Sequence, residues 1–200
     1  METELKYACP SGEILTKILT DPALLPRFTG QVERIQMQTA YYDTPSRALR
    51  ARRWTLRLRQ ENERTVAACK TAGAQQGALT SHGEWEVNAQ TIAEALPALA
   101  AAGAPEELLT LTAEGVEQTC AAAFLRRSVT LALDGGTLAE LSCDLGELAG
   151  PTQREALCEV EVELKAGPLE PMLAFGEQLA AQWGLSPESR SKLARALALE

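Results

Sequence analysis

Polar and apolar side chains alternate with a period of two in many short stretches of the chain, which is typical of β-strands with one buried face. This alternation predicts strands at residues 2–8, 31–42, 53–60, 64–70, 83–88, 124–133, 137–145 and 156–165. Helical spacing or alanine-rich composition predicts helices at 12–20, 90–102 (with a break or kink at Pro97), 169–182 and 187–199, and partly at 105–121. Many strands joined by turns, with a few helices, indicate an α+β domain built on a barrel or a strongly curved sheet. No repeat or linker divides the chain, so we expect one domain, residues 1–200.

The charged side chains of these strands are sorted by sign. Residues two apart share a strand face, so Glu159, Glu161 and Glu163 lie together on one strand. Arg57 and Arg59 likewise lie together on another. A solvated sheet face would normally intersperse the two signs, because like charges repel. Carboxylate oxygens suit Mg²⁺ or Mn²⁺ and arginine forks suit phosphate oxygens, so the pattern favours a ligand made of a divalent cation and a polyphosphate.

Composition narrows the class of partner and the compartment. Hydrophobic residues make up 46 % of the chain, which is typical of a folded protein, and the net charge is −8. An acidic protein is not expected to bind nucleic acid or a membrane surface, both of which are anionic. The five cysteines include no CxxC pair and indicate neither a disulfide framework nor a zinc site. Without a secretory signal or a long apolar run, a cytoplasmic location is expected.

Several motifs resemble those of the CYTH superfamily, the triphosphate tunnel metalloenzymes. Glu2-Thr3-Glu4-Leu5-Lys6 matches the ExExK signature of that superfamily, a pattern that is weak when it stands alone. The further matches are Tyr41-Tyr42-Asp43-Thr44-Pro45, Leu56-Arg57-Leu58-Arg59, Lys70 with Gly73, Gly83-Glu84-Trp85-Glu86, Asp144-Leu145-Gly146-Glu147, Glu159-Val160-Glu161-Val162-Glu163-Leu164, and Ser191-Lys192 with Arg195. They follow the order of the family from residue 2 to residue 195, and together they make the resemblance specific.

The resemblance implies a closed eight-stranded antiparallel β-barrel, a tunnel with a charged lumen, helices packed outside and a C-terminal capping helix. It also implies Mg²⁺ or Mn²⁺ as cofactor. The implied metal ligands are Glu2, Glu4 and Glu161, with Asp144, Glu159 and Glu163 for a second ion or for orienting water. The implied phosphate-binding residues are Lys6, Arg57, Arg59, Lys70, Arg126, Lys192 and Arg195. Glu4, Glu161 and Lys192 are the expected catalytic residues, although basic residues at a helix end also suit a solvated terminus.

The pattern most resembles bacterial inorganic triphosphatases, which predicts hydrolysis of tripolyphosphate to diphosphate and phosphate. Class IV adenylyl cyclase, thiamine triphosphatase and nucleoside triphosphatase activities remain alternatives, as does a polyphosphate sensor without catalysis. Many inorganic triphosphatases carry a C-terminal CHAD domain. The resemblance therefore raises the alternative that such a domain follows in the full-length protein. Outside the family pattern, His82 is the single histidine and is expected at the surface, and Trp54 is expected to pack rather than to stack on a ligand.

Overall fold

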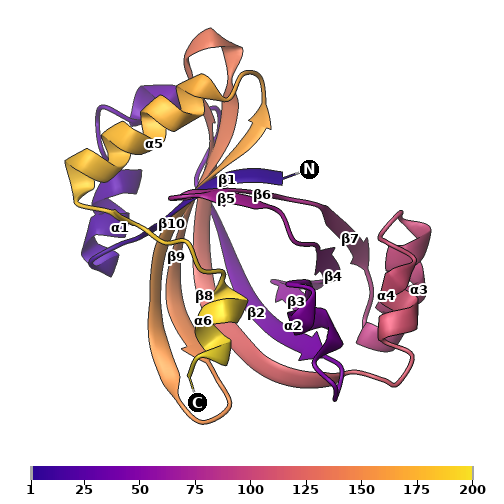
Figure 1. Cartoon of the computed structure of the whole chain (residues 1–200). Helices are drawn as coiled ribbons and strands as arrows, with labels where there is room; N and C mark the ends of the chain where they lie inside the picture. Colours follow the sequence, from indigo (N-terminus) through magenta and orange to yellow (C-terminus); the bar gives the residue numbers. More distant parts are fainter. Residues whose placement is uncertain (1, 200) are drawn as a thin grey trace.

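One strongly curved antiparallel sheet forms the body of the molecule (Figure 1). The computed structural model describes residues 2–199. The strands are β1 (Glu2–Ala8), β2 (Glu33–Asp43), β3 (Thr55–Glu61), β4 (Arg64–Lys70), β5 (Ala74–Gln76), β6 (Leu79–His82), β7 (Glu84–Asn88), β8 (Glu117–Ala132), β9 (Leu138–Ala149), β10 (Arg154–Ala166) and β11 (Ser186–Pro187). Their hydrogen-bonded order is β5-β6-β1-β10-β9-β8-β2-β3-β4-β7, and β11 pairs with β1.

The sheet curls until β6, the neighbour of the end strand β5, and the other end strand, β7, come together at Gly83, the residue between them in the chain. β6 pairs with β1 and β7 pairs with β4, so the ends are joined by the chain itself. The Thr71 amide donates to the Gly83 carbonyl at 3.0 Å, and Lys70 Nζ lies 2.7 Å from the Glu2 carboxylate. Over residues 2–199 no strand ladder links the two ends, so the curved antiparallel sheet is confirmed but the expected closure into eight strands is not observed.

Helices cover the outside of the sheet in two groups (Figure 1). The helices are α1 (Gly12–Leu19), α2 (Ala48–Ala51), α3 (Ile92–Ala101), α4 (Glu107–Leu111), α5 (Glu170–Trp183) and α6 (Lys192–Leu197), with 3-10 turns at Leu25–Arg27 and Asp134–Gly136. The first group, α1 and α5, packs on the outward apolar side chains of β1, β9 and β10, and the second, α3 and α4, packs beside β4 and β7. The apolar residues under these two groups therefore lie outside the curve and are covered, while the concave face carries the charged residues and a third apolar cluster, around Phe124, that packs against α6.

Three element boundaries differ from the sequence-based expectations. Residues 105–121 were expected to be partly helical, but α4 is short and the long strand β8 already begins at Glu117. The last helix begins at Lys192 rather than at 187 because Ser186–Pro187 pairs with β1. The strand expected at 53–60 begins at Thr55, since Arg53 adopts a left-handed conformation with φ of 57°. Helix α3 continues through Pro97.

Within residues 2–199, no helix has both the length and the apolar composition needed to cross a bilayer.

Candidate active site

The concave face of the sheet encloses a small cavity lined mainly by charged side chains. Its volume is about 110 Å³. The lining residues come from β1, β2, β3, β4, β6, β8, β9, β10 and α6 and include Glu2, Glu4, Lys6, Arg57, Arg59, Lys70, His82, Arg126, Glu161, Glu163 and Lys192. The alternation of strand side chains thus brings most of the predicted site residues together. The predicted residues Asp144 and Glu159 lie behind this lining and contact Lys192, and Arg195 in turn contacts Glu159.

Helix α6 closes one side of the cavity with a buried lysine. Lys192 Nζ lies 2.9 Å from Asp144 Oδ2 and 2.8 Å from one oxygen each of Glu159 and Glu161. Ser191 caps the helix by accepting a hydrogen bond from the Ala194 amide at 3.0 Å, which fixes where Lys192 begins to point inward. Burial lowers the pKa of Lys192, but the three carboxylates outweigh it and raise this pKa well above its usual value.

Two arginines, Arg126 and Arg195, also neutralise the carboxylates that Lys192 contacts. Arg126 donates from Nε and Nη2 to both oxygens of Asp144, at 2.8 and 2.7 Å, and also contacts Glu161. Arg195 contacts Glu159. Oxygens of Asp144, Glu159 and Glu161 converge within 4.8 Å of one another, the spacing of a metal site, and here they hold these cationic side chains. Burial opposes ionisation of Glu161, yet Lys192 and Arg126 lower its pKa well below the usual value.

Glu4 and Lys6 of β1 lack the ion pairs that their neighbours make. Both line the cavity, and Lys6 is only 4 % exposed. Glu4 accepts a hydrogen bond from Thr80 Oγ1 at 3.2 Å, but among the described residues no basic side chain lies within ion-pair distance of it. Burial, and then the charge of Glu161, raise the pKa of Glu4. One carboxyl group and one ammonium group therefore face the same cavity without making an ion pair to any of residues 2–199.

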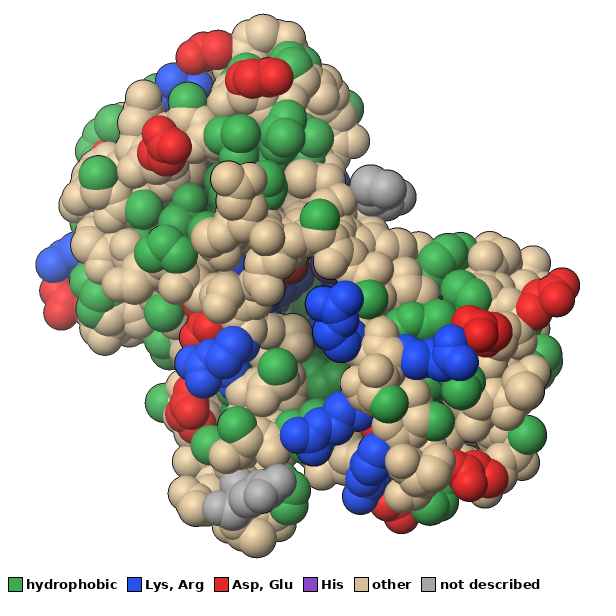
Figure 2. Space-filling view, viewed as in Figure 1, with side chains coloured by type: hydrophobic (Ala, Val, Ile, Leu, Met, Phe, Trp, Pro, Cys, Tyr) green, Lys and Arg blue, Asp and Glu red, His purple; other side chains and the backbone are tan. Residues whose placement is uncertain are grey.

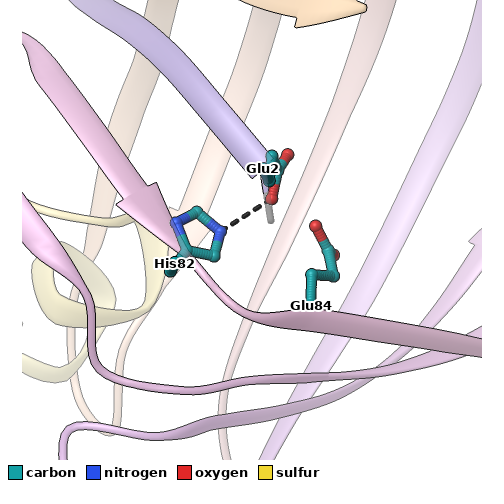
Figure 3. A group of neighbouring side chains, drawn as sticks. All are labelled: Glu2, His82 and Glu84. Carbon is teal, nitrogen blue, oxygen red and sulfur yellow. Dashed lines mark ion pairs between the residues drawn. The ribbon is translucent and has the colours of Figure 1, made fainter. Parts of the chain in front are cut away.

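The opposite wall holds a second cluster, made by Glu2, His82 and Glu84 (Figure 3). Lys70 Nζ lies 2.7 Å from Glu2 and 2.9 Å from Glu84, and His82 Nε2 lies 2.7 Å from Glu2. Burial raises the pKa of Glu2, but His82, Glu84 and Lys70 together lower it further than burial raises it. Burial and the hydrogen bond with Glu2 raise the pKa of Glu84 to about 8.

The prediction that His82 lies at the surface is therefore wrong. Its side chain is 14 % exposed and lines the cavity. The polar sequence around His82 suggested a solvated loop, but residues Leu79–His82 form β6, and Glu2 lies opposite His82 in the register with β1. Sequence periodicity could not reveal a four-residue strand followed at once by Gly83.

We compared the sequence with models of known protein families. The model of the CYTH domain matches residues 1–197. The chain belongs to the CYTH family.

Solved structures of similar fold agree with this assignment. A protein from Hippeastrum, HpAC1, is 18 % identical with a TM-score of 0.66, over 99 % of this chain and 96 % of that one. It is named as a candidate adenylyl cyclase and described as having a dominant triphosphatase activity. The PH1819 protein from Pyrococcus horikoshii OT3 is 19 % identical with a TM-score of 0.61, over 99 % of both chains. At these identities the likeness concerns the fold alone.

The carboxyl groups of this CYTH domain fit a divalent cation of the kind expected for the family. Glu4 is a half-buried oxygen donor that makes no ion pair in the described part of the chain, and it lies close enough to Glu161 for that charge to raise its pKa. Burying two carboxylates together is costly unless a cation joins them. Carboxylate oxygens are the ligands that Mg²⁺ and Mn²⁺ prefer.

An aromatic ring lies beneath the cations of the CYTH site, a feature that the sequence analysis missed. The ring centre of Phe124 lies 5.9 Å from the Cζ atoms of Arg59 and Arg126 and 5.2 Å from Lys192 Nζ. Phe124 is 1 % exposed. Because Phe124 precedes Arg126 by two residues on β8, alternation could have placed it on the inner face. A ring in this position attracts cations and holds them at a common depth.

Beyond the inner cavity lies a wider one of about 480 Å³, which shares Glu4, Lys6, Lys70 and His82 with it. The wider cavity is also lined by Arg50, Arg53, Trp54, Tyr42 and Arg190. Figure 2 shows Lys and Arg side chains around a hollow on this face of the molecule. Trp54 packs against the apolar cluster beneath α3 and α4, as expected, and also borders this outer cavity. The outer cavity is thus basic and partly aromatic.

The Tyr41-Tyr42-Asp43-Thr44-Pro45 motif has a structural explanation in Asp43, which is 6 % exposed. Its Oδ1 accepts hydrogen bonds from the amides of Thr44 and Leu49, at 2.8 and 2.9 Å, and its Oδ2 accepts one from Arg50 at 3.1 Å. These three bonds fold residues 44–50 back beside the start of β3, the strand that carries Arg57 and Arg59.

Proposed function

We propose that this CYTH domain hydrolyses inorganic triphosphate to diphosphate and phosphate with the help of Mg²⁺ or Mn²⁺. One observation carries the proposal: the half-buried carboxyl group of Glu4 and the buried ammonium group of Lys6 face a single cavity, and each lacks an ion-pair partner in the described residues. A polyphosphate supplies oxygens for the ammonium group, and its divalent cation supplies charge for the carboxyl group. Few other small ligands offer both signs so close together.

The binding residues proposed for triphosphate surround the cavity. They are Lys6, Arg57, Arg59, Lys70, Arg126, Lys192 and Arg195. Arg57 is 8 % exposed, and its buried Nε has no hydrogen-bond partner within residues 2–199. An unpaired buried donor is costly, and a phosphate oxygen would satisfy it. Several cations surround one small volume, which suits a chain of phosphates better than a single phosphate group.

The chemistry requires a water molecule to attack the terminal phosphorus while the bond to the leaving diphosphate oxygen breaks. Glu4 and Glu161 would hold the divalent cation together with Glu2, with Asp144, Glu159 and Glu163 for a second ion or for orienting the water. When bound, the cation supplies charge neutralisation of the phosphate oxygens and a lower pKa for its water. Lys192, fixed by three carboxylates, would balance negative charge that develops on the transferred phosphate.

The outer cavity supports a second candidate, hydrolysis or cyclisation of an organic triphosphate. Trp54 and Tyr42 border a space large enough for a ring system, next to the cavity proposed for the phosphates. A base or a thiazolium ring could stack there while the triphosphate occupies the inner cavity. The description of HpAC1, a candidate cyclase with a dominant triphosphatase activity, shows that both activities are considered for one fold.

A parallel assay separates these functions. Release of phosphate is measured from tripolyphosphate, ATP and thiamine triphosphate with Mg²⁺ and with Mn²⁺, and cyclic AMP is measured in the ATP reaction. We expect the highest kcat/KM with tripolyphosphate. Faster turnover of ATP or thiamine triphosphate would favour the organic substrates, and cyclic AMP would favour the cyclase. Tight binding of all three without turnover would identify a sensor and overturn the proposal.

A further inference from the structure

Glu2, His82 and Glu84 form a cluster of mixed chemistry at the wall of the cavity (Figure 3). Each offers one donor atom, a carboxylate oxygen or an imidazole nitrogen, and these three atoms lie within 4.8 Å of one another. The other cluster of this kind within residues 2–199, Asp144 with Glu159 and Glu161, contains oxygen donors only. The two walls of the cavity therefore differ in the type of ion that they suit.

The backbone holds the three donors in place. Glu2 lies opposite His82 in the β1–β6 register, and Glu84 lies opposite Lys70 in the β4–β7 register. Gly83 between the two strands is tightly packed: a Cβ atom there would come within 2.8 Å of the Trp85 ring and 2.9 Å of Thr71 Oγ1. The donors are therefore carried by paired strands on either side of a packed turn, and no loop must move to assemble them.

The imidazole nitrogen of this cluster is available to a metal ion. His82 Nε2 is buried, and it has no hydrogen-bond partner of good geometry in the described part of the chain, although it lies 2.7 Å from Glu2. A metal ion bound here would replace this contact with Glu2 at the nitrogen. Lys70 is the basic residue that bridges the two carboxylates, at 2.7 and 2.9 Å, and so stands where a cation would be attracted.

We propose that Glu2, His82 and Glu84 form a binding site for a transition-metal ion of the Mn²⁺ or Zn²⁺ type. Imidazole nitrogen combined with carboxylate oxygen suits these ions, whereas Mg²⁺ and Ca²⁺ prefer oxygen ligands alone. The site shares Glu2 with the cation set proposed for hydrolysis but does not depend on hydrolysis. Binding of the ion displaces the Lys70 ammonium from Glu2 and Glu84 and leaves it free to contact phosphate. The CYTH domain would then respond differently to Mg²⁺ and to Mn²⁺ or Zn²⁺.

The single histidine of the chain makes a direct test unambiguous, because every imidazole signal in an NMR spectrum of the chain comes from His82. Chain labelled with ¹⁵N is titrated with Zn²⁺ in the absence of any phosphate, and the ring nitrogens are followed. We expect the Nε2 resonance to shift and saturate at one ion per chain, and Mn²⁺ to broaden the ring protons. Mg²⁺ at millimolar concentration, which would bind carboxylate oxygens including those of Glu2, is expected to shift the Nε2 resonance far less than Zn²⁺ because it makes no bond to the nitrogen. An Nε2 resonance insensitive to millimolar Zn²⁺ would overturn the proposal.

Variants identify the other two ligands. Glu84→Gln and Glu2→Gln are each expected to weaken Zn²⁺ binding at least about 10-fold, the order of loss typical of altered metal sites. Glu86→Gln is the matched control: Glu86 lies on the same strand and contacts Arg57, but it is outside the cluster, so its change should leave the affinity unchanged. Lys70→Met should tighten binding, because no ammonium then competes. Equal affinities in wild type, Glu84→Gln and Lys70→Met would contradict the site. These measurements contain no triphosphate. A negative result would therefore reject the metal site only, and the proposed hydrolysis would still be tested by the phosphate-release assay.

Discussion

Glu4 is the residue whose change should affect the proposed chemistry most and the fold least. It is half-buried near Glu161, and Thr80 is the hydrogen-bond donor to its carboxyl group. Glu4→Gln keeps the shape and can still accept that hydrogen bond, but the amide is a poor ligand for a divalent cation. We expect kcat for tripolyphosphate to fall by at least about 100-fold.

The melting temperature of Glu4→Gln should stay equal to that of wild type or rise, because the variant removes a carboxyl group from the neighbourhood of Glu161. Glu63→Gln, in the exposed turn between β3 and β4, serves as the control and should keep full activity. Wild-type turnover by Glu4→Gln would remove Glu4 from the site.

Asp43 should matter for stability rather than for chemistry. Its side chain accepts three backbone N–H bonds from residues 44–50. Asp43→Ala leaves those buried donors without acceptors, which should lower the free energy of unfolding by about 3 kcal/mol. Urea unfolding would show this as a lower midpoint with an unchanged slope. Asp134→Ala, at a carboxylate whose side chain is 90 % exposed, should change stability by less than about 0.5 kcal/mol.

At the scale of elements, helix α6 is held by charge as much as by apolar packing. Lys192 is 7 % exposed and neutralises Asp144, Glu159 and Glu161. Lys192→Met leaves these carboxylates short of one buried positive charge, a change that typically costs about 3–5 kcal/mol. Mg²⁺ should restore part of the lost melting temperature, because oxygens of the three carboxylates converge as metal ligands do.

Thermal unfolding of Lys192→Met with and without Mg²⁺ measures both effects. Lys17→Met on α1, where the lysine side chain is 57 % exposed, is the control for losing a lysine from a helix. If Lys192→Met were as stable as Lys17→Met, α6 would not be fixed by these ion pairs.

Strand faces could be predicted from the sequence, and the way strands combine could not. Alternation correctly placed Arg57, Arg59 and the glutamates of β10 on the inner face, since the period of two is a property of each strand alone. The start of β8 at Glu117 was missed because its alanine-rich first half has no alternation of polarity. The meeting of β6 and β7 at Gly83, which brings His82 to Glu2, depends on contacts between residues about 80 positions apart.

At the scale of the whole molecule, the cysteines report on the integrity of the fold. Cys9, Cys69, Cys120 and Cys143 are buried, and Cys158 is partly exposed. Burial raises the pKa of Cys69 to about 11, and burial likewise raises the pKa of Cys143 and of Cys158 to about 12. A raised pKa keeps the thiol protonated at pH 8, and the thiol form is unreactive.

An aromatic disulfide reagent at pH 8 should therefore label the folded protein slowly and label all five cysteines in urea. The absorbance of the released thiolate measures both rates. Fast labelling of several cysteines without urea would mean that the sheet opens readily.

The last prediction concerns charge across the whole molecule, which carries a net charge of −8 and yet presents a basic cavity. If tripolyphosphate is the substrate, as proposed, it should bind the folded state and not the unfolded chain, so at about 100 times its dissociation constant it should add about 2.7 kcal/mol to the free energy of unfolding. For a chain of this size that corresponds to a rise in melting temperature of roughly 5–10 °C. Lys6→Met removes a buried ammonium group that has no ion-pair partner among the described residues. The variant should consequently be at least as stable as wild type without ligand, and tripolyphosphate should raise its melting temperature far less. An equal rise in both proteins, measured by calorimetry, would place the anion outside this cavity.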